Sequence, residues 1–599
     1  MNFKLRLIAL LLLTMIMLSS CSLSLESVMQ QLPEIPFLES LLGSGSEQTT
    51  PPDSTESTTL TGSTGPVEPP KVPWRVENSS SIKDMLERYT LTREEADATL
   101  ALLDEIVAGA LPDPEGDPNV ATLTIEEVDA LYLQFEEAFY HTAQQMTIAS
   151  IIYYYDMSDE ESKNRHLDTQ EMFYDIQDKY TESCRTMYLS SPYASEFFDG
   201  WSEEEIQSLL DFDPTTTALK KEIEELQVQY NSLSNNAFTD GSAEIYAQIV
   251  TKGNQLARLY GYDNYYEYAS KNVYGRDYST EDLQKFQDYV VEYVVPRYSK
   301  LKKWEEIYNL SSSRRDLAIS FLSDSFDSSN MNKNYLLLYL DSLGDTTMGV
   351  AMRDVFDSKN CIFSSESQSH PTAFCTYMYE DETPFCLFGS SGQTVNTMVH
   401  EIGHYYASYV NNDLNNYDLC ETHSQANEYL FLQYCKGEIN SKVYEVVRYY
   451  NLFNSYYIIL CATIIDDFEQ RVYSLDSVEG FTSADFDAIM TEVIADYGKT
   501  PEWFATNITD MYSYWRKVAI DNPVYYISYA VSSIAAVEIF AIAESTAENE
   551  GYEAAQQIYI GLVEGVTEED GFCEALKKVG LYTPFEEEAF QKVAATMRK

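Results

Sequence analysis

Apolar and aromatic side chains recur at helical spacing through most of the chain after residue 74. After residue 280, for example, this spacing joins Leu283, Phe286, Val290, Val294 and Leu301. An α-helix repeats about every 3.6 residues, so such spacing predicts amphipathic helices. Similar runs occupy roughly 82–109, 124–155, 219–260, 441–470 and 530–549. The fold is therefore expected to be mainly α-helical.

The clearest strand signal lies between residues 373 and 388. Two apolar segments, Ala373 to Tyr379 and Pro384 to Phe388, flank the acidic turn Glu380-Asp381-Glu382. Short β-prone segments on either side of a polar turn are typical of a β-hairpin. The sequence therefore predicts a small hairpin within an otherwise helical protein.

The N-terminal residues predict an exported, lipid-anchored protein. Lys4 and Arg6 precede the apolar run from Leu7 to Met17, which is too short to span a membrane. The following Leu18-Ser19-Ser20-Cys21 resembles the lipobox of bacterial lipoproteins. Lipidated Cys21 would attach the chain to the bacterial cell membrane on its extracytoplasmic face. An ordinary secretion signal is the alternative.

Composition then divides the rest of the chain. Residues 44 to 73 are rich in Ser, Thr, Gly, Pro and Glu and cannot bury a core. The expected organisation is a signal peptide at 1–21, a disordered tether at 22–73, an N-terminal helical region at 74–218 and a larger region at 219–599.

Charge and cysteine content exclude some functions. The net charge of −57 argues against nucleic-acid binding. Most carboxylates are expected on solvated helix faces, with attraction of cationic peptides as the alternative. The nine cysteines show no C-x-x-C spacing, which disfavours a cysteine metal cluster. Cys375 and Cys386 flank the hairpin turn and could form a disulfide or remain free buried thiols.

The most distinctive motif is His400-Glu401-Ile402-Gly403-His404, the H-E-x-x-H pattern of zinc metallohydrolases. Residues four apart lie one above the other on a helix, so both imidazoles can reach one Zn²⁺ at about 2.0–2.1 Å. Glu401 lies beside them and is suited to be the general base that takes a proton from a zinc-activated water. Apolar residues flank the motif at helical spacing, and Thr394 is the expected N-cap.

A catalytic zinc needs a third protein ligand and one open position. Glu421 can be that ligand, because the helix-breaking residues 411–416 allow a second helix to begin before it. Ser424 and Glu428 share its helix face, so either could hydrogen-bond a histidine ring. A solvated carboxylate is the alternative for Glu428. His423 points away from this face and is expected to be structural.

Three segments carry a resemblance to a known family. They are Thr397–His404 with the following Glu421-x-x-Ser424-Gln425-x-Asn427-Glu428, Gln255–Tyr265, and Tyr525–Ala530. Together they resemble the oligoendopeptidase F and thimet oligopeptidase family of zinc peptidases, from about residue 220 to the C-terminus. The resemblance implies a catalytic region at 219–599, a helical shell around a channel, and one Zn²⁺ per chain. It also implies that an edge strand of the hairpin pairs with the peptide substrate, with a purely structural hairpin as the alternative.

The resemblance assigns site residues as well. It implies the zinc ligands and general base named above, and a hydrogen bond to the oxyanion from Tyr529, with Tyr525 or Tyr526. Because the chain has 48 tyrosines, core packing is the alternative role for Tyr529. Many members of the family place a histidine just before this tyrosine run, whereas no histidine follows His423 here.

The sequence therefore predicts a membrane-anchored zinc metallopeptidase that hydrolyses short unfolded peptides outside the cytoplasm. The alternatives are a peptide-binding lipoprotein without turnover and a dipeptidyl carboxypeptidase. Glu401 argues against a pure binding protein, which has no need of a base. No group that would capture a substrate C-terminus is identifiable in the sequence.

Overall fold

The computed structural model describes residues 79–597 except for 202, 211–214, 234–239, 299–309, 316–317, 319–330, 371, 391–392, 412–415, 499–517, 521, 546–549 and 568–569. The expected signal peptide at 1–21, its Cys21 and the expected tether at 22–73 lie outside the described residues. No helix in the described part is both long enough and apolar enough to cross a membrane.

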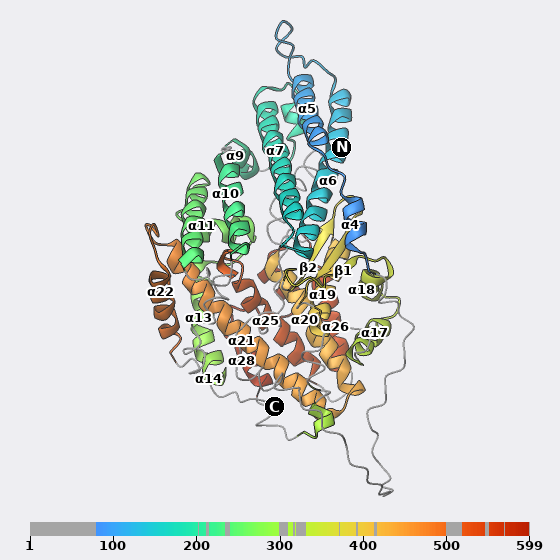
Figure 1. The fold of residues 1–599 in the computed structure, drawn as a ribbon, viewed down its shortest axis with the longest axis vertical. Helices are drawn as coiled ribbons and strands as arrows, with labels where there is room; N and C mark the ends of the chain where they lie inside the picture. Colours follow the sequence, from blue (N-terminus) through green and yellow to red (C-terminus); the bar gives the residue numbers. More distant parts are fainter. Residues whose placement is uncertain are drawn as a thin grey trace, which may run out of the picture.

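The N-terminal helices stand together at one end of the molecule (Figure 1). They are α4 (Ile82–Arg88), α5 (Arg93–Ala110), α6 (Ile125–Tyr155), α7 (Glu160–Ser190), α8 (Ala194–Phe197) and α9 (Glu203–Leu210). Helices α5, α6 and α7 pack against one another around buried Phe135, Phe139 and Phe173. The run predicted over 82–109 contains two helices, because Thr92 and Glu95 form a capping box that begins a new one.

A second series of helices follows along the chain. It comprises α10 (Thr215–Asn231), α11 (Asp240–Leu259), α12 (Tyr265–Tyr268), η2 (Ala269–Val273), α13 (Thr280–Tyr289), η3 (Val290–Val294), α14 (Val295–Tyr298), α17 (Met331–Ser342) and α18 (Thr347–Asp357). The run predicted over 219–260 thus contains two helices, and the expected boundary between 218 and 219 falls inside α10.

The predicted hairpin is confirmed and belongs to a three-stranded sheet. Strands β2 (Ala373–Met378) and β3 (Thr383–Phe388) are antiparallel, while β1 (Cys361–Phe363), which was not predicted, runs parallel to β3 on its other side. Cys375 lies directly opposite Cys386, and both are free thiols in this structure. The sheet therefore has the order β1-β3-β2, with β2 at one edge.

The two faces of the sheet pack against different parts of the molecule. Phe374 and Leu387 on one face join a cluster with Met85 of α4 and Ile148 of α6. Phe388 on the other face belongs to the main core, which contains the helix that follows the sheet. The sheet thus connects the N-terminal helices to the central ones.

The remaining helices build the main core. They are α19 (Val395–Asn411), α20 (Tyr417–Glu438), α21 (Ser441–Tyr473), α22 (Ser483–Asp496), α25 (Ile527–Ala543), α26 (Glu550–Glu564), α27 (Phe572–Lys578) and α28 (Glu587–Thr596). Helix α25 is almost entirely buried and packs against α20, α21, α26 and α28 (Figure 1). Helices α21 and α25 correspond to the runs predicted at 441–470 and 530–549. The mainly α-helical fold class is confirmed.

Candidate active site

Helix α19 carries the H-E-x-x-H motif in the core. Thr394 begins the helix as predicted, since its Oγ1 accepts a hydrogen bond from the backbone N–H of Thr397 at 3.1 Å. One and a half turns later His400 and Glu401 are buried, with 1% and 0% of their surface exposed. The sequence thus places two ionisable residues inside a helix that is mostly buried.

Gly403 allows α20 to approach α19 closely. A Cβ at this position would lie 2.8 Å from Ser424 Cα and 2.9 Å from the carbonyl oxygen of His423, both backbone atoms of α20. The Asn427 side-chain amide also crosses the interface and donates to the carbonyl oxygen of Val399 at 2.7 Å. This close packing brings the ligand candidates of the two helices within reach of one ion.

His400, His404 and Glu421 converge on one point. The two Nε2 atoms are 3.2 Å apart, and Glu421 Oε2 lies 3.4 Å from His400 Nε2 and 3.8 Å from His404 Nε2. Two ligands about 2.0–2.1 Å from a tetrahedral Zn²⁺ are about 3.3 Å apart. All three residues are buried, and their atoms fit a single metal ion in spacing and in donor chemistry.

Protonation states favour metal binding at His404 and Glu421. Burial lowers the pKa of His404 to about 4, so its imidazole is neutral near pH 7 and can bind a metal. Burial alone would raise the pKa of Glu421, but His404, His400 and the Tyr525 hydroxyl outweigh it and lower that pKa. Burial would lower the pKa of His400 too, but its contacts with Glu421 and Glu428 raise it, so a metal at this site would displace a proton from His400.

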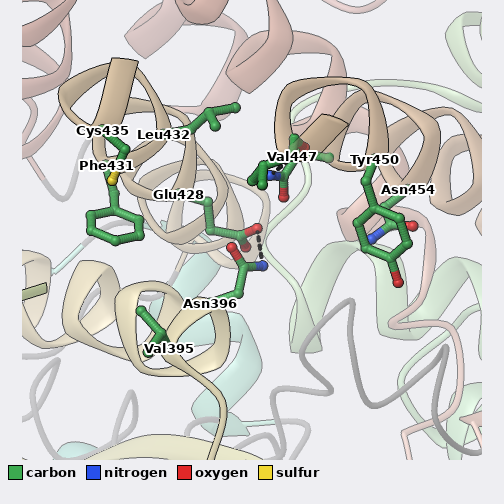
Figure 2. Close-up of a pocket in the computed structure, with 10 residues that line it drawn as sticks. Val395, Asn396, Glu428, Phe431, Leu432, Cys435, Val447, Tyr450 and Asn454 are labelled. Atoms are coloured by element: carbon green, nitrogen blue, oxygen red, sulfur yellow. Dashed lines mark hydrogen bonds between the residues drawn. The ribbon is translucent and has the colours of Figure 1, made fainter. Parts of the chain in front are cut away.

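Glu428 orients His400. Its Oε1 lies 2.7 Å from His400 Nδ1, which leaves Nε2 to face the metal position. Its Oε2 accepts a hydrogen bond from the Asn396 side chain at 2.9 Å, and both residues line a pocket between α19, α20 and α21 (Figure 2). The cavity volume is about 20 Å³, room for about one water molecule and too small for a peptide.

Ser424 and His423 have different surroundings. Ser424 Oγ lies 3.0 Å from the carbonyl oxygen of Glu421 and 3.2 Å from its Oε2, so it contacts the candidate carboxylate ligand rather than a histidine ring. His423 Nε2 lies 3.3 Å from the carbonyl oxygen of Leu562, and burial lowers its pKa to about 3. His423 therefore lies outside the metal group formed by His400, His404 and Glu421, as the sequence predicted.

Of the three candidate tyrosines, Tyr525 reaches the metal group. Its hydroxyl donates a hydrogen bond to Glu421 Oε1 at 2.5 Å. Tyr529, on the first turn of α25, is buried, and its ring packs edge-on against the rings of Tyr525 and Tyr526. The structure brings the three rings together beside the two helices that carry the metal group.

Sequence reasoning did not identify four residues that shape this site. Gly403 and Asn396 carried a local signal, because a glycine within a helix suggests close packing and an asparagine four residues before His400 shares its face. Arg276 and Glu469 lie far away in sequence and carried no such signal. They contact the backbone beside Tyr525, as described below.

Comparisons with known proteins agree on the fold. No protein-family model matches the chain, and no curated protein does. A solved structure assigned to oligoendopeptidase F has a TM-score of 0.67 at 15% identity and covers 86% of this chain and 98% of its own. PZ peptidase A, solved with an inhibitor, has a TM-score of 0.63 at 17% identity. The match covers 88% of this chain and 97% of that protein's chain.

A third structure, assigned to oligoendopeptidase F from Bacillus anthracis str. Ames, has a TM-score of 0.63 at 16% identity, with 87% of this chain and 98% of its own covered. The three likenesses span nearly the whole of each of these proteins. The chain therefore has the fold of these peptidases, as the resemblance of its motifs implied.

Proposed function

We propose that this protein is a zinc metallopeptidase that hydrolyses short unfolded peptides. The observation that carries the proposal is the convergence of His400, His404 and Glu421 at spacings that suit one zinc ion, with Glu401 on the same buried helix turn. The shared fold with oligoendopeptidase F structures supports it. Peptides bound in an extended form could add to the edge of the sheet at β2, which precedes α19.

The side chains of the site have distinct roles in this proposal. His400, His404 and Glu421 would hold one Zn²⁺, which when bound supplies Lewis acidity toward water and toward a carbonyl oxygen. Glu401 would accept the proton of the attacking water and pass it to the leaving amine. Glu428 would keep the His400 ring in the orientation that presents Nε2.

A tyrosine would stabilise the negative charge that develops on the peptide oxygen. A phenol has one proton and donates one hydrogen bond at a time, and Tyr525 donates its own to Glu421. This favours Tyr529 as the oxyanion donor, with Tyr526 as its neighbour in the same cluster.

We also propose that the enzyme acts at the extracytoplasmic face of a bacterial membrane through lipidated Cys21. The support is the sequence Leu18-Ser19-Ser20-Cys21 after a short apolar run. Cys21→Ala should move the protein from the membrane fraction to the soluble fraction. A variant that stays membrane-bound would refute the lipid anchor.

The deciding experiment is digestion of a mixed library of roughly 5- to 15-residue peptides, a length suited to an extended substrate. The full chain, purified in detergent, is compared with Glu401→Gln, and zinc content is measured in parallel. The variant should keep zinc and lose about 10²–10⁴-fold in turnover, because it lacks the base. Product masses separate internal from terminal cleavage.

Glu94→Gln, the same substitution at an exposed position of α5, is the matched control and should retain full activity. Full activity of Glu401→Gln would overturn the mechanism. Bound zinc without cleavage by the wild-type protein would favour the peptide-binding lipoprotein.

A further inference from the structure

The hydroxyl of Tyr525 fixes the orientation of the Glu421 carboxylate. It donates to Oε1 at 2.5 Å, while Oε2 is left to face the Nε2 atoms of His400 and His404. Both partners are buried, with 5% of Tyr525 and 0% of Glu421 exposed, so water does not compete for this hydrogen bond. Tyr525 therefore holds one oxygen of the third metal-ligand candidate, while Ser424 Oγ lies 3.2 Å from the other.

The backbone just before Tyr525 is strained. Val524 has φ of +67°, in the left-handed region that a β-branched residue rarely occupies. Strain of this kind persists only where the surrounding structure imposes it, and it concentrates at functional sites.

Two buried ionisable side chains hold the strained residue by its two backbone polar atoms. Glu469 Oε1, on α21, accepts a hydrogen bond from the Val524 N–H at 2.8 Å. Arg276 Nη2 donates to the Val524 carbonyl oxygen at 2.7 Å. The Arg276 guanidinium is charged, so its hydrogen bond is stronger than one between neutral groups, and Glu469 supplies a buried acceptor for the Val524 N–H.

Arg276 also connects this turn to the helix that carries Glu421. Its Nη2 lies 3.4 Å from the Tyr525 carbonyl oxygen and 3.2 Å from Ser528 Oγ, at the start of α25. Its Nε lies 3.9 Å from Asp418 Oδ1, in the first turn of α20, and both of these side chains are buried. One guanidinium therefore lies between the turn that carries Tyr525 and the helix that carries Glu421.

A neighbouring residue holds Arg276 itself in place. The guanidinium stands over the ring of Tyr274, 4.7 Å from its centroid, and the hydroxyl of Tyr274 donates to the Pro523 carbonyl oxygen at 2.7 Å. The residue before Val524 is thus fixed by the same cluster. The turn is held by Arg276, Glu469 and Tyr274 and by no regular secondary structure of its own.

We propose that Arg276 and Glu469 are positioning residues that clamp the strained Val524–Tyr525 turn, so that the Tyr525 hydroxyl holds Glu421 in its metal-binding orientation. The inference rests on the proposed function for the identity of the metal and for its turnover readout. It predicts that both side chains act on the metal group through one atom, the Tyr525 hydroxyl oxygen.

The test is a double-mutant cycle in which the affinity for Zn²⁺ is measured. The full chain in detergent competes for zinc with a chromophoric chelator. Tyr525→Phe should weaken zinc binding about 10- to 100-fold, as loss of a group that orients a ligand typically does. Glu469→Leu should weaken it to a similar extent. Glu469→Gln retains an oxygen acceptor for the Val524 N–H and should restore affinity to within about threefold of wild type.

The double variant carrying Glu469→Leu and Tyr525→Phe separates positioning from general damage. If Glu469 acts through the hydroxyl, the double variant binds zinc no more weakly than Tyr525→Phe alone. Losses that multiply, or wild-type affinity in Glu469→Leu, would overturn the proposal. Arg276→Lys, which keeps the charge but lacks the planar fork, provides a second cycle with the same expectation if Glu469→Leu does not fold.

Asp466→Asn is the matched control. Asp466 lies one turn before Glu469 and accepts hydrogen bonds from the Tyr266 hydroxyl and from Gln470 Nε2, each at 2.7 Å; asparagine keeps one of these acceptors and touches neither backbone atom of Val524. This variant should leave zinc affinity unchanged, and an equal loss there would assign the effect to the buried charges in general. If the wild-type protein binds zinc but cleaves no peptide, the proposed function fails while the affinity cycle still decides this inference.

Discussion

The helix pair α19–α20 and the turn that leads to Tyr525 meet at the same carboxylate but are built differently. In the helix pair, regular backbone spaces the ligand candidates along each helix, and the close packing at Gly403 brings the two helices together. In the turn, a strained residue is held by side chains from positions 276 and 469. One part of the site is thus specified locally and the other by distant parts of the chain.

The helix pair and the turn should respond differently to substitution. A helix pair is a rigid frame for a metal, because its ligands shift only if the helices shift. The turn adds the hydroxyl of Tyr525, and its position depends on several buried hydrogen bonds together. Substitutions in the frame should therefore abolish zinc binding, whereas substitutions in the turn should weaken binding or slow turnover.

The largest effect is expected in the frame, from His404→Ala. Loss of one of three protein ligands should reduce zinc content from about one per chain to none, and peptide cleavage to background. Metal analysis of the dialysed protein checks this. His141→Ala, on α6, is the control, because His141 bonds Glu380 outside the metal group. Stoichiometric zinc in His404→Ala would refute the ligand set.

A second comparison separates two tyrosines of one cluster. Tyr529→Phe should lower kcat about 10²–10³-fold, as loss of one oxyanion donor does, and leave zinc affinity unchanged. Tyr525→Phe should instead weaken zinc binding, since its hydroxyl bonds Glu421. Steady-state kinetics at saturating zinc distinguish them. An unchanged kcat in Tyr529→Phe would assign Tyr529 to core packing.

Gly403→Ala tests how closely the two helices of the frame must approach. The added methyl would press on backbone atoms of α20, so the helices must separate. We expect a loss of about 1–3 kcal/mol in the free energy of unfolding and weaker zinc binding. Denaturant unfolding and chelator competition measure the two effects.

Gly437→Ala, in the last turns of α20, is the matched control, since a Cβ there meets nothing within 4 Å. Alanine is the better helix former by up to about 1 kcal/mol, so this variant should be slightly stabilised. Equal behaviour of the two variants would show that the close approach at Gly403 is unimportant.

The frame could be predicted from the sequence because its signals are local. Four-residue spacing, a helix-breaking segment and a second helix face indicate His400, His404 and Glu421, while they left open whether Glu428 or Ser424 would bond a histidine ring. The hairpin before α19 was recognisable from its acidic turn for the same reason. Strand β1 was not, because three residues give no periodic pattern and its parallel pairing depends on distant contacts.

Asn522-Pro523 marks a turn, but nothing near residue 524 indicates its strain or the side chains that hold it. The family resemblance implied Tyr529, with Tyr525 or Tyr526, as the oxyanion donor, and it did not indicate that Tyr525 would bond Glu421. In the sequence, Arg276 and Glu469 cannot be distinguished from the other ionisable residues of a chain in which 23% of residues are Asp, Glu, Lys or Arg. Only the fold brings the two side chains to one backbone segment. Long-range hydrogen bonds of this kind leave no signature in local spacing.

The smallest effect sought concerns the strain in the turn, and a pair of substitutions at Val524 measures it. Both Val524→Ala and Val524→Gly remove a buried side chain and should lower stability. Alanine remains strained at φ of +67°, whereas glycine accepts this conformation without steric cost. Glycine is normally the less stable of the two, so a Val524→Gly protein about 1 kcal/mol more stable than Val524→Ala would show that the clamp holds a strained backbone. The reverse order in denaturant unfolding would mean that the turn carries no such strain, and it would leave Arg276 and Glu469 as supports for an ordinary turn.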